Sequence, residues 1–277
     1  MEALDYPAFR ARVKNELAAL RGRQALMFYS GGRDSSVVLH FLEHAAREFS
    51  FSFETHAALF PPHVYAAGER ERLDGYWRSR GVAIVWHEIP QDESALAEAH
   101  TQGLSPCRLC NKAKKAALMG YVRSRGPDLD RQVIVMSYSL WDLVSASLEH
   151  ILAARFAAPG HDPAVRYKPV EERFLETFQR FYPLLRLPGG MEVFKPLVFW
   201  NDPQIVAVLR REGIPVLERA CRFKPFRPKR NLSELYERLG LAFDFDRVRA
   251  FAAEALGLPP AEAFSSMNRE DYLRNIL

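Results

Sequence analysis

Cysteine is scarce in this sequence. Three residues, Cys107, Cys110 and Cys221, are present among 277. That number is too small for the disulfide framework of a small secreted domain, and too small for a four-cysteine zinc site. Long apolar runs are also missing: the sequence contains no stretch of 18 apolar residues and no signal-peptide pattern. These absences argue against secreted and membrane proteins, and we expect a cytoplasmic one.

The chain also lacks internal repeats and low-complexity tracts. Its hydrophobic fraction of 48% is typical of a globular protein, and its net charge of +4 is compatible with a polyanionic partner without requiring one. A chain of this length can hold one large domain with an appendage. We expect an N-terminal helix over residues 1–23, a main domain over residues 24–230 and a helical extension over residues 231–277.

Residues 25–39 are the stretch around which the rest is organised. A short apolar strand is followed by a Ser-Gly-Gly turn and then by a helix with an apolar face. Paired glycines let the backbone approach a ligand closely, and the helix start directs N–H groups and a positive dipole end into the turn. The sequence therefore predicts an anion site, formed by Ser30, Gly31, Gly32, Ser35 and Ser36. Asp34 fits a phosphate cradle if Mg²⁺ accompanies the phosphate, or it caps the helix.

Hydrophobic periodicity predicts strands that alternate with helices along the chain. The expected strands cover residues 24–29, 51–59, 82–86, 132–137 and 191–194, with a strand-like segment at 213–216. The expected helices cover residues 1–24, 35–49, 65–80, 92–100, 107–125, 141–156, 171–182 and 203–212, with two or three more after residue 231. Residues 157–170 are expected to be irregular. This alternation indicates a parallel α/β sheet with its ligand at the carboxyl ends of the strands.

Cys107 and Cys110 form a C-x-x-C pair at the start of a basic helix. The pair is compatible with a redox dithiol, with half of a zinc site, or with an Fe–S site that has Cys221 as a third ligand. A redox dithiol usually sits in a thioredoxin-like setting, which is not evident, and the zinc site would need histidines to complete it. Three thiolates on a [4Fe–4S] cube would leave one iron open to an exogenous sulfur species.

The loop S-G-G-R-D-S-S at residues 30–36 lacks the Walker spacing and resembles the PP-loop of the N-type ATP pyrophosphatases. Over residues 20–235 the chain resembles the Fe–S-dependent tRNA 2-thiolation enzymes, the tRNA 2-thiocytidine synthase family. The further motifs that carry this resemblance are Pro62-His63-Val64, C-R-L-C-N-K-A-K-K at residues 107–115, Lys195-Pro196-Leu197, and Ile214-Pro215 ahead of Cys221.

The resemblance implies an α/β fold, with a parallel-sheet PP-loop ATP pyrophosphatase domain (adenine nucleotide alpha hydrolase-like) and a helical C-terminal tail. It implies an ATP-dependent sulfurtransferase that adenylates a base carbonyl and replaces its oxygen by sulfur. The implied cofactors are ATP, Mg²⁺ and a [4Fe–4S] cluster held by Cys107, Cys110 and Cys221. The implied partners are tRNA or a small-molecule substrate and a sulfur donor protein or sulfide, with a homodimer as the state that the family suggests.

Carried over residue by residue, the resemblance assigns ATP and Mg²⁺ to Ser30, Gly31, Gly32, Arg33, Asp34, Ser35, Ser36, Lys114, Ser137 and Asp142. Lys114 falls where the family has a basic residue near the phosphates. Asp34, Lys114 and Asp142 are the candidate catalytic residues.

One motif departs from the family. Where the family has G-H-x-x-D-D, this chain has Ser137–Asp142, which keeps only the last aspartate, and Asp142 alone could also be a helix N-cap. Two alternatives therefore stay open: a PP-loop enzyme that adenylates a small molecule, and a non-catalytic nucleotide- or cluster-binding protein. The basic run Arg222–Arg230 could contact RNA or be a solvated loop, and the histidines His63, His87 and His150 are expected to be structural.

Overall fold

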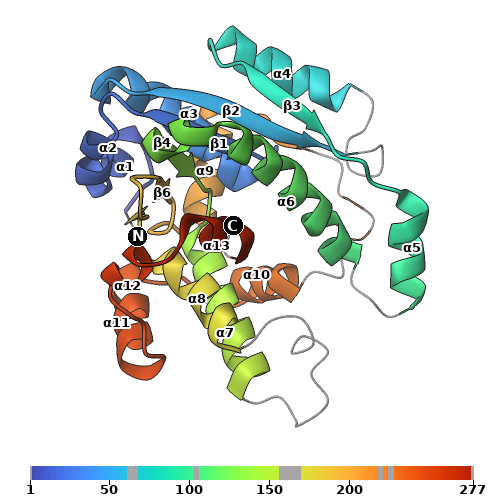
Figure 1. Cartoon of the computed structure of the whole chain (residues 1–277), viewed down its shortest axis with the longest axis vertical. Coiled ribbons are helices and arrows are strands. Elements are labelled where there is room, and N and C mark those ends of the chain that lie inside the picture. The colour runs from blue at the N-terminus through green and yellow to red at the C-terminus, as the bar shows by residue number, and fades with distance from the viewer. Residues whose placement is uncertain are drawn as a thin grey trace.

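The computed structural model describes residues 2–60, 68–102, 106–155, 170–217, 221, 223 and 228–275. Within these residues a six-stranded sheet has the order β3-β2-β1-β4-β6-β5, and its strands are parallel except for β5, which pairs antiparallel with β6 (Figure 1). The strands are β1 Gln24–Tyr29, β2 Ser52–Leu59, β3 Ile84–Glu88, β4 Gln132–Val135, β5 Leu184–Arg186 and β6 Glu192–Phe194. Among the described residues, no helix is long and apolar enough to cross a membrane.

Helices follow the strands and cover both faces of the sheet (Figure 1). They are α1 Tyr6–Arg12, α2 Lys14–Ala19, α3 Arg33–Phe49, α4 Glu69–Ser79, α5 Glu93–Thr101, α6 Pro106–Ser124, α7 Leu140–Arg155, α8 Val170–Phe178, α9 Asp202–Glu212, α10 Pro228–Arg238, α11 Phe245–Ala255, α12 Glu262–Ser265 and α13 Arg269–Asn275, with short 3₁₀ helices η1 Gly126–Arg131 and η2 Gln179–Phe181.

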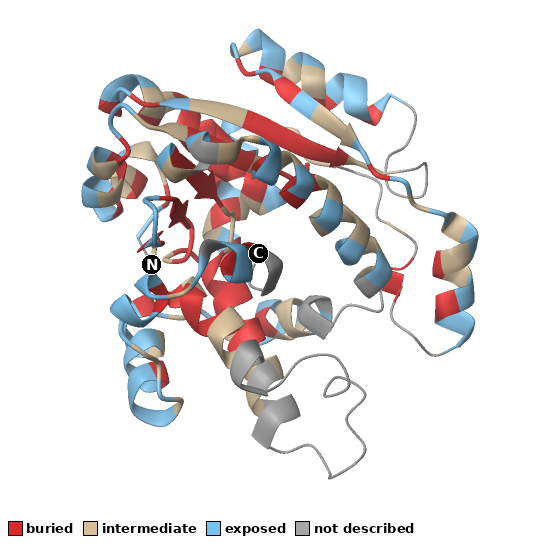
Figure 2. Ribbon diagram, in the orientation of Figure 1, coloured by how far each residue is buried: buried red, intermediate tan, exposed pale blue. Residues whose placement is uncertain are grey.

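The central strands are buried because both faces of the sheet are covered. All four residues of β4 are buried, and so are most of β1 and the carboxyl half of β2 (Figure 2). Parallel strands with helices on both sides carry apolar side chains at consecutive positions, which is why these segments read as near-continuous apolar runs in the sequence.

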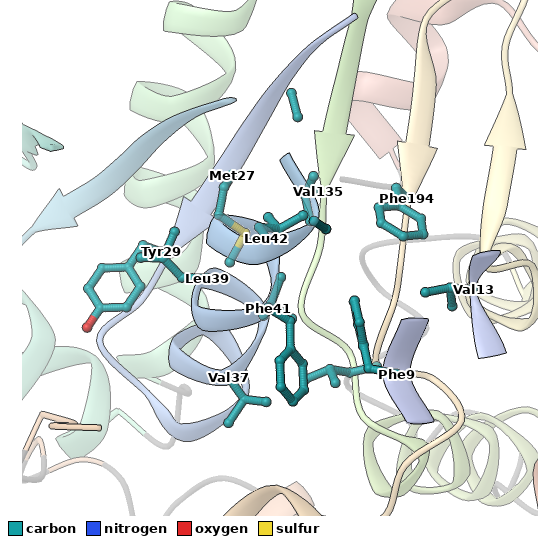
Figure 3. Close-up of a cluster of buried hydrophobic side chains, with 14 of the residues drawn as sticks. Phe9, Val13, Met27, Tyr29, Val37, Leu39, Phe41, Leu42, Val135 and Phe194 are labelled. Atoms are coloured by element: carbon teal, nitrogen blue, oxygen red, sulfur yellow. The ribbon is translucent and has the colours of Figure 1, made fainter. Parts of the chain in front are cut away.

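The first face packs against α1, α2, α3 and α9. Figure 3 shows this core, in which Met27 of β1 and Val135 of β4 meet Phe41 of α3 and Phe9 of α1. The apolar stripe expected in the N-terminal helix is confirmed, since Phe9 and Val13 are fully buried. The single predicted helix is nevertheless two, because Val13 leaves helical geometry with φ −119° and ψ 25°.

The second face packs against α6, α7, α8 and the C-terminal helices. The side chains of Phe264 and Tyr272 are fully buried in this second core, and the Tyr272 hydroxyl donates to Gln179 Oε1 at 2.9 Å. The region after residue 231 therefore contributes directly to the core around β4 and β6. Within the described residues it contains most of α10 and then α11, α12 and α13, so it has four helices where two or three were predicted.

Two details of the sheet differ from the sequence prediction. The strand β5 was not predicted, because three residues are too few for a periodic pattern; it forms a hairpin with β6 through Gly189 and Gly190, both at positive φ. The predicted strand at 213–216 is wrong. That segment instead crosses the loop after β1, where the Leu217 N–H donates to the Gly31 carbonyl at 2.7 Å.

Candidate active site

The loop between β1 and α3 closes on its own hydroxyl groups. The Ser30 N–H donates to Ser35 Oγ at 3.2 Å, and the Gly32 N–H donates to Ser30 Oγ at 3.3 Å. Gly31 has φ +71°, in the left-handed region that favours glycine. A Cβ on Gly32 would lie 3.2 Å from Ser30 Oγ and would crowd the loop. The loop is thus a compact turn of glycines and hydroxyls at the carboxyl end of a central strand, which fits a phosphate cradle.

The first turn of α3 directs backbone N–H groups and the positive end of the helix dipole toward this loop. Gly32 is its N-cap, without a side-chain capping bond, so the cap role considered for Asp34 is wrong and Asp34 lies in the first helical turn. Ser35 and Ser36, the next two residues of the helix, have buried side chains. The Ser36 hydroxyl donates to the Tyr29 hydroxyl at 3.4 Å, which also accepts from Trp77 Nε1 at 3.0 Å. These bonds fix the helix start, whose N–H groups and dipole favour an anion.

A polar chain joins the starts of α3, α7 and α9. Arg33 Nη2 donates to Asp202 Oδ2 at 3.2 Å, and Ser139 Oγ donates to Asp202 Oδ1 at 2.8 Å. The Ser139 N–H and the Asp142 carboxylate pair at 3.3 Å, while the Asp142 N–H donates back to Ser139 Oγ at 3.2 Å. The structure therefore brings two of the predicted site residues, Arg33 and Asp142, into one network through Asp202 and Ser139, which the sequence did not single out.

Asp142 completes a capping box instead of acting as the N-cap. The Ser139 carbonyl accepts the first helical bond of α7, from Leu143 N–H at 3.1 Å, so Ser139 is the capping residue and Asp142 is its partner three positions on. Ser137, the first residue of the departing motif, lies between β4 and this cap and is half-buried. The G-H-x-x-D-D stretch of the family is here a serine-based helix start at the carboxyl end of β4.

Asp202 is the buried acid of this network. It is the first residue of α9 and only 5% exposed, and burial raises its pKa, against the lowering effects of the Ser139 hydrogen bond and the Arg33 charge. The preceding Asn201 forms a capping box with Gln204 and accepts a hydrogen bond from Trp141 Nε1 at 2.9 Å. The Asn-Asp-Pro signature is a helix-start signal in the sequence, but nothing in it indicates a contact with Arg33.

The cysteines lie on two segments that meet. Cys107 and Cys110 occupy the first turn of α6 and are half-buried, and Cys107 Sγ hydrogen-bonds to the Phe223 carbonyl at 3.7 Å. Phe223 is two residues after Cys221, which is also half-buried. Lys114 lies four residues after Cys110, on the same side of α6, and is half-buried. The structure therefore brings Cys107 close to the segment that carries Cys221.

The loop after β1 lies at the other end of this segment. The Leu217 N–H binds Gly31, and Phe223 binds Cys107, so the chain from 217 to 223 connects the two motifs. Seven residues of fully extended chain span at most about 25 Å. The two contacts are therefore at most about 25 Å apart, and the loop after β1 lies at the carboxyl edge of the sheet, where open α/β folds bind their ligands.

The three thiols are not arranged to chelate a single ion. Among the described residues, the group of three His, Cys, Asp or Glu side chains near enough for that is His40, Glu43 and His44 on α3. Arg80 already occupies this place, because its guanidinium donates to Glu43 Oε2 at 2.8 Å and lies 3.3 Å from His40 Nδ1. Ligands of a four-iron cube bind different irons, so a three-cysteine cluster does not require its sulfurs to converge on one point.

Of the three histidines expected to be structural, the structure describes the side chain of His87. His87 Nε2 lies 2.9 Å from His56 Nδ1, and His56 Nε2 lies 3.2 Å from Glu54 Oε2, in a chain between β2 and β3. Burial lowers the pKa of both His56 and His87, so these rings are neutral hydrogen-bonding groups of the sheet, as expected for His87. The motif Pro62-His63-Val64 lies outside the described residues, as do most of the basic run 222–230 and the side chain of His150.

No family model matches the sequence, and no curated protein matches it. The structure does match solved ones. The U34-tRNA thiolase NcsA from Methanococcus maripaludis, with its [4Fe–4S] cluster, matches with a TM-score of 0.55 and 11% identity, over 98% of this chain and 81% of that chain. An NMN synthetase from Francisella tularensis matches with a TM-score of 0.46 and 11% identity, over 90% and 92% of the two chains.

An NAD+ synthetase from Burkholderia pseudomallei matches with a TM-score of 0.40 and 14% identity, over 90% of each chain. The match with the thiolase shows that the chain shares the fold of that protein, a mixed α/β fold with a mostly parallel central sheet. The predicted fold class is confirmed.

Proposed function

We propose that this protein is an ATP-dependent sulfurtransferase, which activates a carbonyl oxygen of an acceptor by adenylation and replaces it by sulfur. We favour tRNA as the acceptor. The observation that carries the proposal is the hydrogen bond between Cys107 and the Phe223 carbonyl. It holds the C-x-x-C turn of α6 against the segment of the third cysteine, whose start contacts the loop after β1.

The loop after β1 has the chemistry that the first step needs. Ser30, Gly32 and the start of α3 offer donors to the phosphates of ATP, and Arg33 and Lys114 add positive charge. The acceptor oxygen attacks the α-phosphorus, pyrophosphate leaves, and the acceptor becomes an adenylate. Positive groups that neutralise the departing charge lower the barrier of such a step. Asp34 and Asp142 are the carboxylates that would hold Mg²⁺.

The second step needs a sulfur nucleophile near the adenylate. Sulfide from a donor displaces AMP, so that the acceptor oxygen leaves on AMP and a thiocarbonyl remains. Cys107, Cys110 and Cys221 are the residues that would hold a [4Fe–4S] cluster, which would supply an open iron for that sulfide. The three thiols fit this cluster. All three are half-buried, and among the described residues no His, Asp or Glu side chain lies close enough to form a single-ion site with them.

The test begins with anaerobic reconstitution of the purified protein with iron and sulfide. We expect about four irons per chain with the broad visible band of a [4Fe–4S] cluster in the wild type, and loss of both in Cys221→Ala. Lys112→Ala is the matched control, because Lys112 is an exposed residue of the same helix. A wild type that takes up no iron would refute the sulfur-transfer proposal, while leaving ATP use by the loop open.

The acceptor is tested with ATP, sulfide and the reconstituted protein. Pyrophosphate release and thiolated nucleosides are measured with bulk tRNA and, separately, with small carbonyl and amide substrates. Gly32→Ala should lower pyrophosphate release, because its Cβ would crowd Ser30 Oγ, while Gly75→Ala places its Cβ in open space and should not. Release with small substrates alone favours the small-molecule alternative, and no release with any acceptor favours a non-catalytic binding protein.

A further inference from the structure

Arg72 on α4 binds a peptide group that itself binds the loop after β1. Its Nη2 donates to the Val216 carbonyl oxygen at 2.7 Å. That carbonyl and the Leu217 N–H belong to the same peptide group, and the N–H donates to the Gly31 carbonyl oxygen at 2.7 Å. A single peptide group thus connects a side chain of α4 to the glycine turn of the candidate phosphate cradle.

The helix that carries Arg72 is attached to the base of the same loop. The side chains of Leu73 and Trp77 are 0% exposed. Trp77 Nε1 donates at 3.0 Å to the hydroxyl of Tyr29, the residue that precedes the loop. Glu69, one turn before Arg72, also contacts the guanidinium, with 3.5 Å between Arg72 Nη2 and Glu69 Oε1. Arg72 therefore projects from a helix that is packed in the core and hydrogen-bonded to the end of β1.

The segment that Arg72 binds is also held at its start. Ile214 is 5% exposed and its N–H donates to the Leu209 carbonyl at 3.0 Å, so the chain leaves the end of α9 in a fixed direction. Val216 follows two residues later. Both polar atoms of the peptide group after Val216 are bound, the carbonyl by Arg72 and the N–H by the loop. Arg72 and the loop therefore set the orientation of this peptide group together.

The chain of contacts continues into the loop. A trans peptide group is planar, so its carbonyl and its N–H point in opposite directions. The bond from the Leu217 N–H fixes the direction of the Gly31 carbonyl, and with it the direction of the Gly32 N–H. That N–H donates to Ser30 Oγ at 3.3 Å. Arg72 thus stands at the head of two peptide groups joined end to end. Hydrogen bonds in such a chain polarise one another, and a cation on the first carbonyl strengthens the last donor.

We propose that Arg72 is a positioning residue of the phosphate cradle: through the peptide group after Val216, it directs the Gly32 N–H at a bound phosphate. This role rests on the proposed function, in which the loop binds the phosphates of ATP. A phosphate oxygen replaces Ser30 Oγ as the acceptor, since the present bond of 3.3 Å is longer than the usual range. Arg72 acts through the backbone and without contacting the phosphate itself.

The first test measures the hydrogen exchange of single backbone amides by NMR, without any ligand. In Arg72→Ala the Val216 carbonyl loses its donor, so we expect the Leu217 amide to exchange about tenfold faster than in the wild type or more. The amides of β4 are the internal reference and should not change, which excludes a loss of global stability. Arg72→Lys keeps a cationic donor and should restore slow exchange. Arg78→Ala is the matched control, because it removes another arginine of α4 that pairs with a carboxylate, Asp74, and it should change nothing.

The second test measures the Kd of Mg·ATP for the same four proteins by titration calorimetry. We expect Kd to rise about tenfold in Arg72→Ala, the effect of losing one charge-assisted hydrogen bond. Arg72→Lys and Arg78→Ala should bind ATP like the wild type.

The two tests together separate positioning from other roles. Weaker ATP binding in Arg72→Ala with unchanged exchange of the Leu217 amide would overturn the proposal, since it would assign the effect to the charge of Arg72 alone. Faster exchange with an unchanged Kd would overturn it as well. A wild type that binds no ATP would instead refute the proposed function, and the exchange of Leu217 would still decide whether Arg72 orients the loop.

Discussion

Asp202 gives the sharpest test of the network that joins the three helix starts. Its two carboxylate oxygens do different work: Oδ1 accepts from the buried Ser139 hydroxyl, and Oδ2 accepts from Arg33, whose side chain is 43% exposed. Asp202→Ala removes both bonds. Asp202→Asn keeps an oxygen for Ser139 but removes the charge that faces Arg33. Comparing the two variants therefore separates the buried hydrogen bond from the ion pair.

The structure sets the magnitudes. Ser139 is 0% exposed, so leaving its hydroxyl without an acceptor should cost about 1–3 kcal/mol. The ion pair is half-exposed on the arginine side, and such pairs contribute roughly 0–1 kcal/mol. We therefore expect urea unfolding to give Asp202→Ala a free energy of unfolding about 1–3 kcal/mol below the wild type, and Asp202→Asn one within about 1 kcal/mol of it.

The pH dependence provides a second check with a definite sign. The pKa of Asp202 is raised in the folded state, so the folded protein holds this proton more tightly than the unfolded chain does. The contribution of Asp202 to stability therefore falls as the pH rises from its unfolded pKa through its folded one. Asp202→Asn should lack this component, and its stability relative to the wild type should rise over that interval.

Equal losses in Asp202→Ala and Asp202→Asn would refute this reasoning, because they would show that the charge and not the Ser139 bond matters. A double-mutant cycle with Ser139→Ala isolates the bond itself, and we expect a coupling of about 1–3 kcal/mol between the two positions. ATP affinity is the functional readout. Both Asp202 variants release Arg33 from its anchor, so both should bind ATP more weakly than the wild type.

Two further predictions concern positions away from the loop. Burial, together with the charge of Arg80, lowers the pKa of His40 to about 4. As the pH drops, the unfolded chain therefore takes up this proton before the folded protein does, and the free energy of unfolding should fall by up to about 3 kcal/mol between about pH 7 and pH 4. In urea unfolding measured across this pH range, His40→Gln should lose this dependence. Gly190→Ala should lower the free energy of unfolding by about 1–3 kcal/mol, because φ is +102° and the new Cβ would lie 2.8 Å from the Asp130 carbonyl oxygen. Gly257 also has positive φ, but its Cβ would meet open space, so Gly257→Ala should cost about 1 kcal/mol in the same assay. A Gly190→Ala midpoint equal to that of Gly257→Ala would contradict the steric part of this prediction.

Local features of the fold were predictable because their signals are local. The strand Gln24–Tyr29 has the bounds that its apolar run predicted, and the helix that starts after the glycines ends at Phe49, as its pattern indicated. The C-x-x-C helix and the helix after β4 also lie within two residues of their predicted starts. In each of these segments, the hydrophobic periodicity and the residues that begin or end the element occur within about 20 neighbouring positions.

The long-range contacts of the candidate site were not predictable in the same way. Arg33 and Asp202 are 169 positions apart, and their pairing depends on the order of β1, β4 and β6 in the sheet. The burial of Lys195 depends on helices that come before and after it in the chain. A lysine in a single sequence carries no mark that distinguishes a buried position from an exposed one, so the burial of Lys195 could be found only in the structure.

The segment from Leu217 to Phe223 contacts both motifs that the sequence singled out. At its start a backbone N–H binds the carbonyl of Gly31, and at its end a backbone carbonyl binds the thiol of Cys107. Cys221 lies between these two contacts. Its position is therefore set by the glycine loop on one side and by the cysteine helix on the other. Because Cys221 lies between these two contacts, we expect a change that shifts the Gly31 carbonyl to shift the position of Cys221 as well.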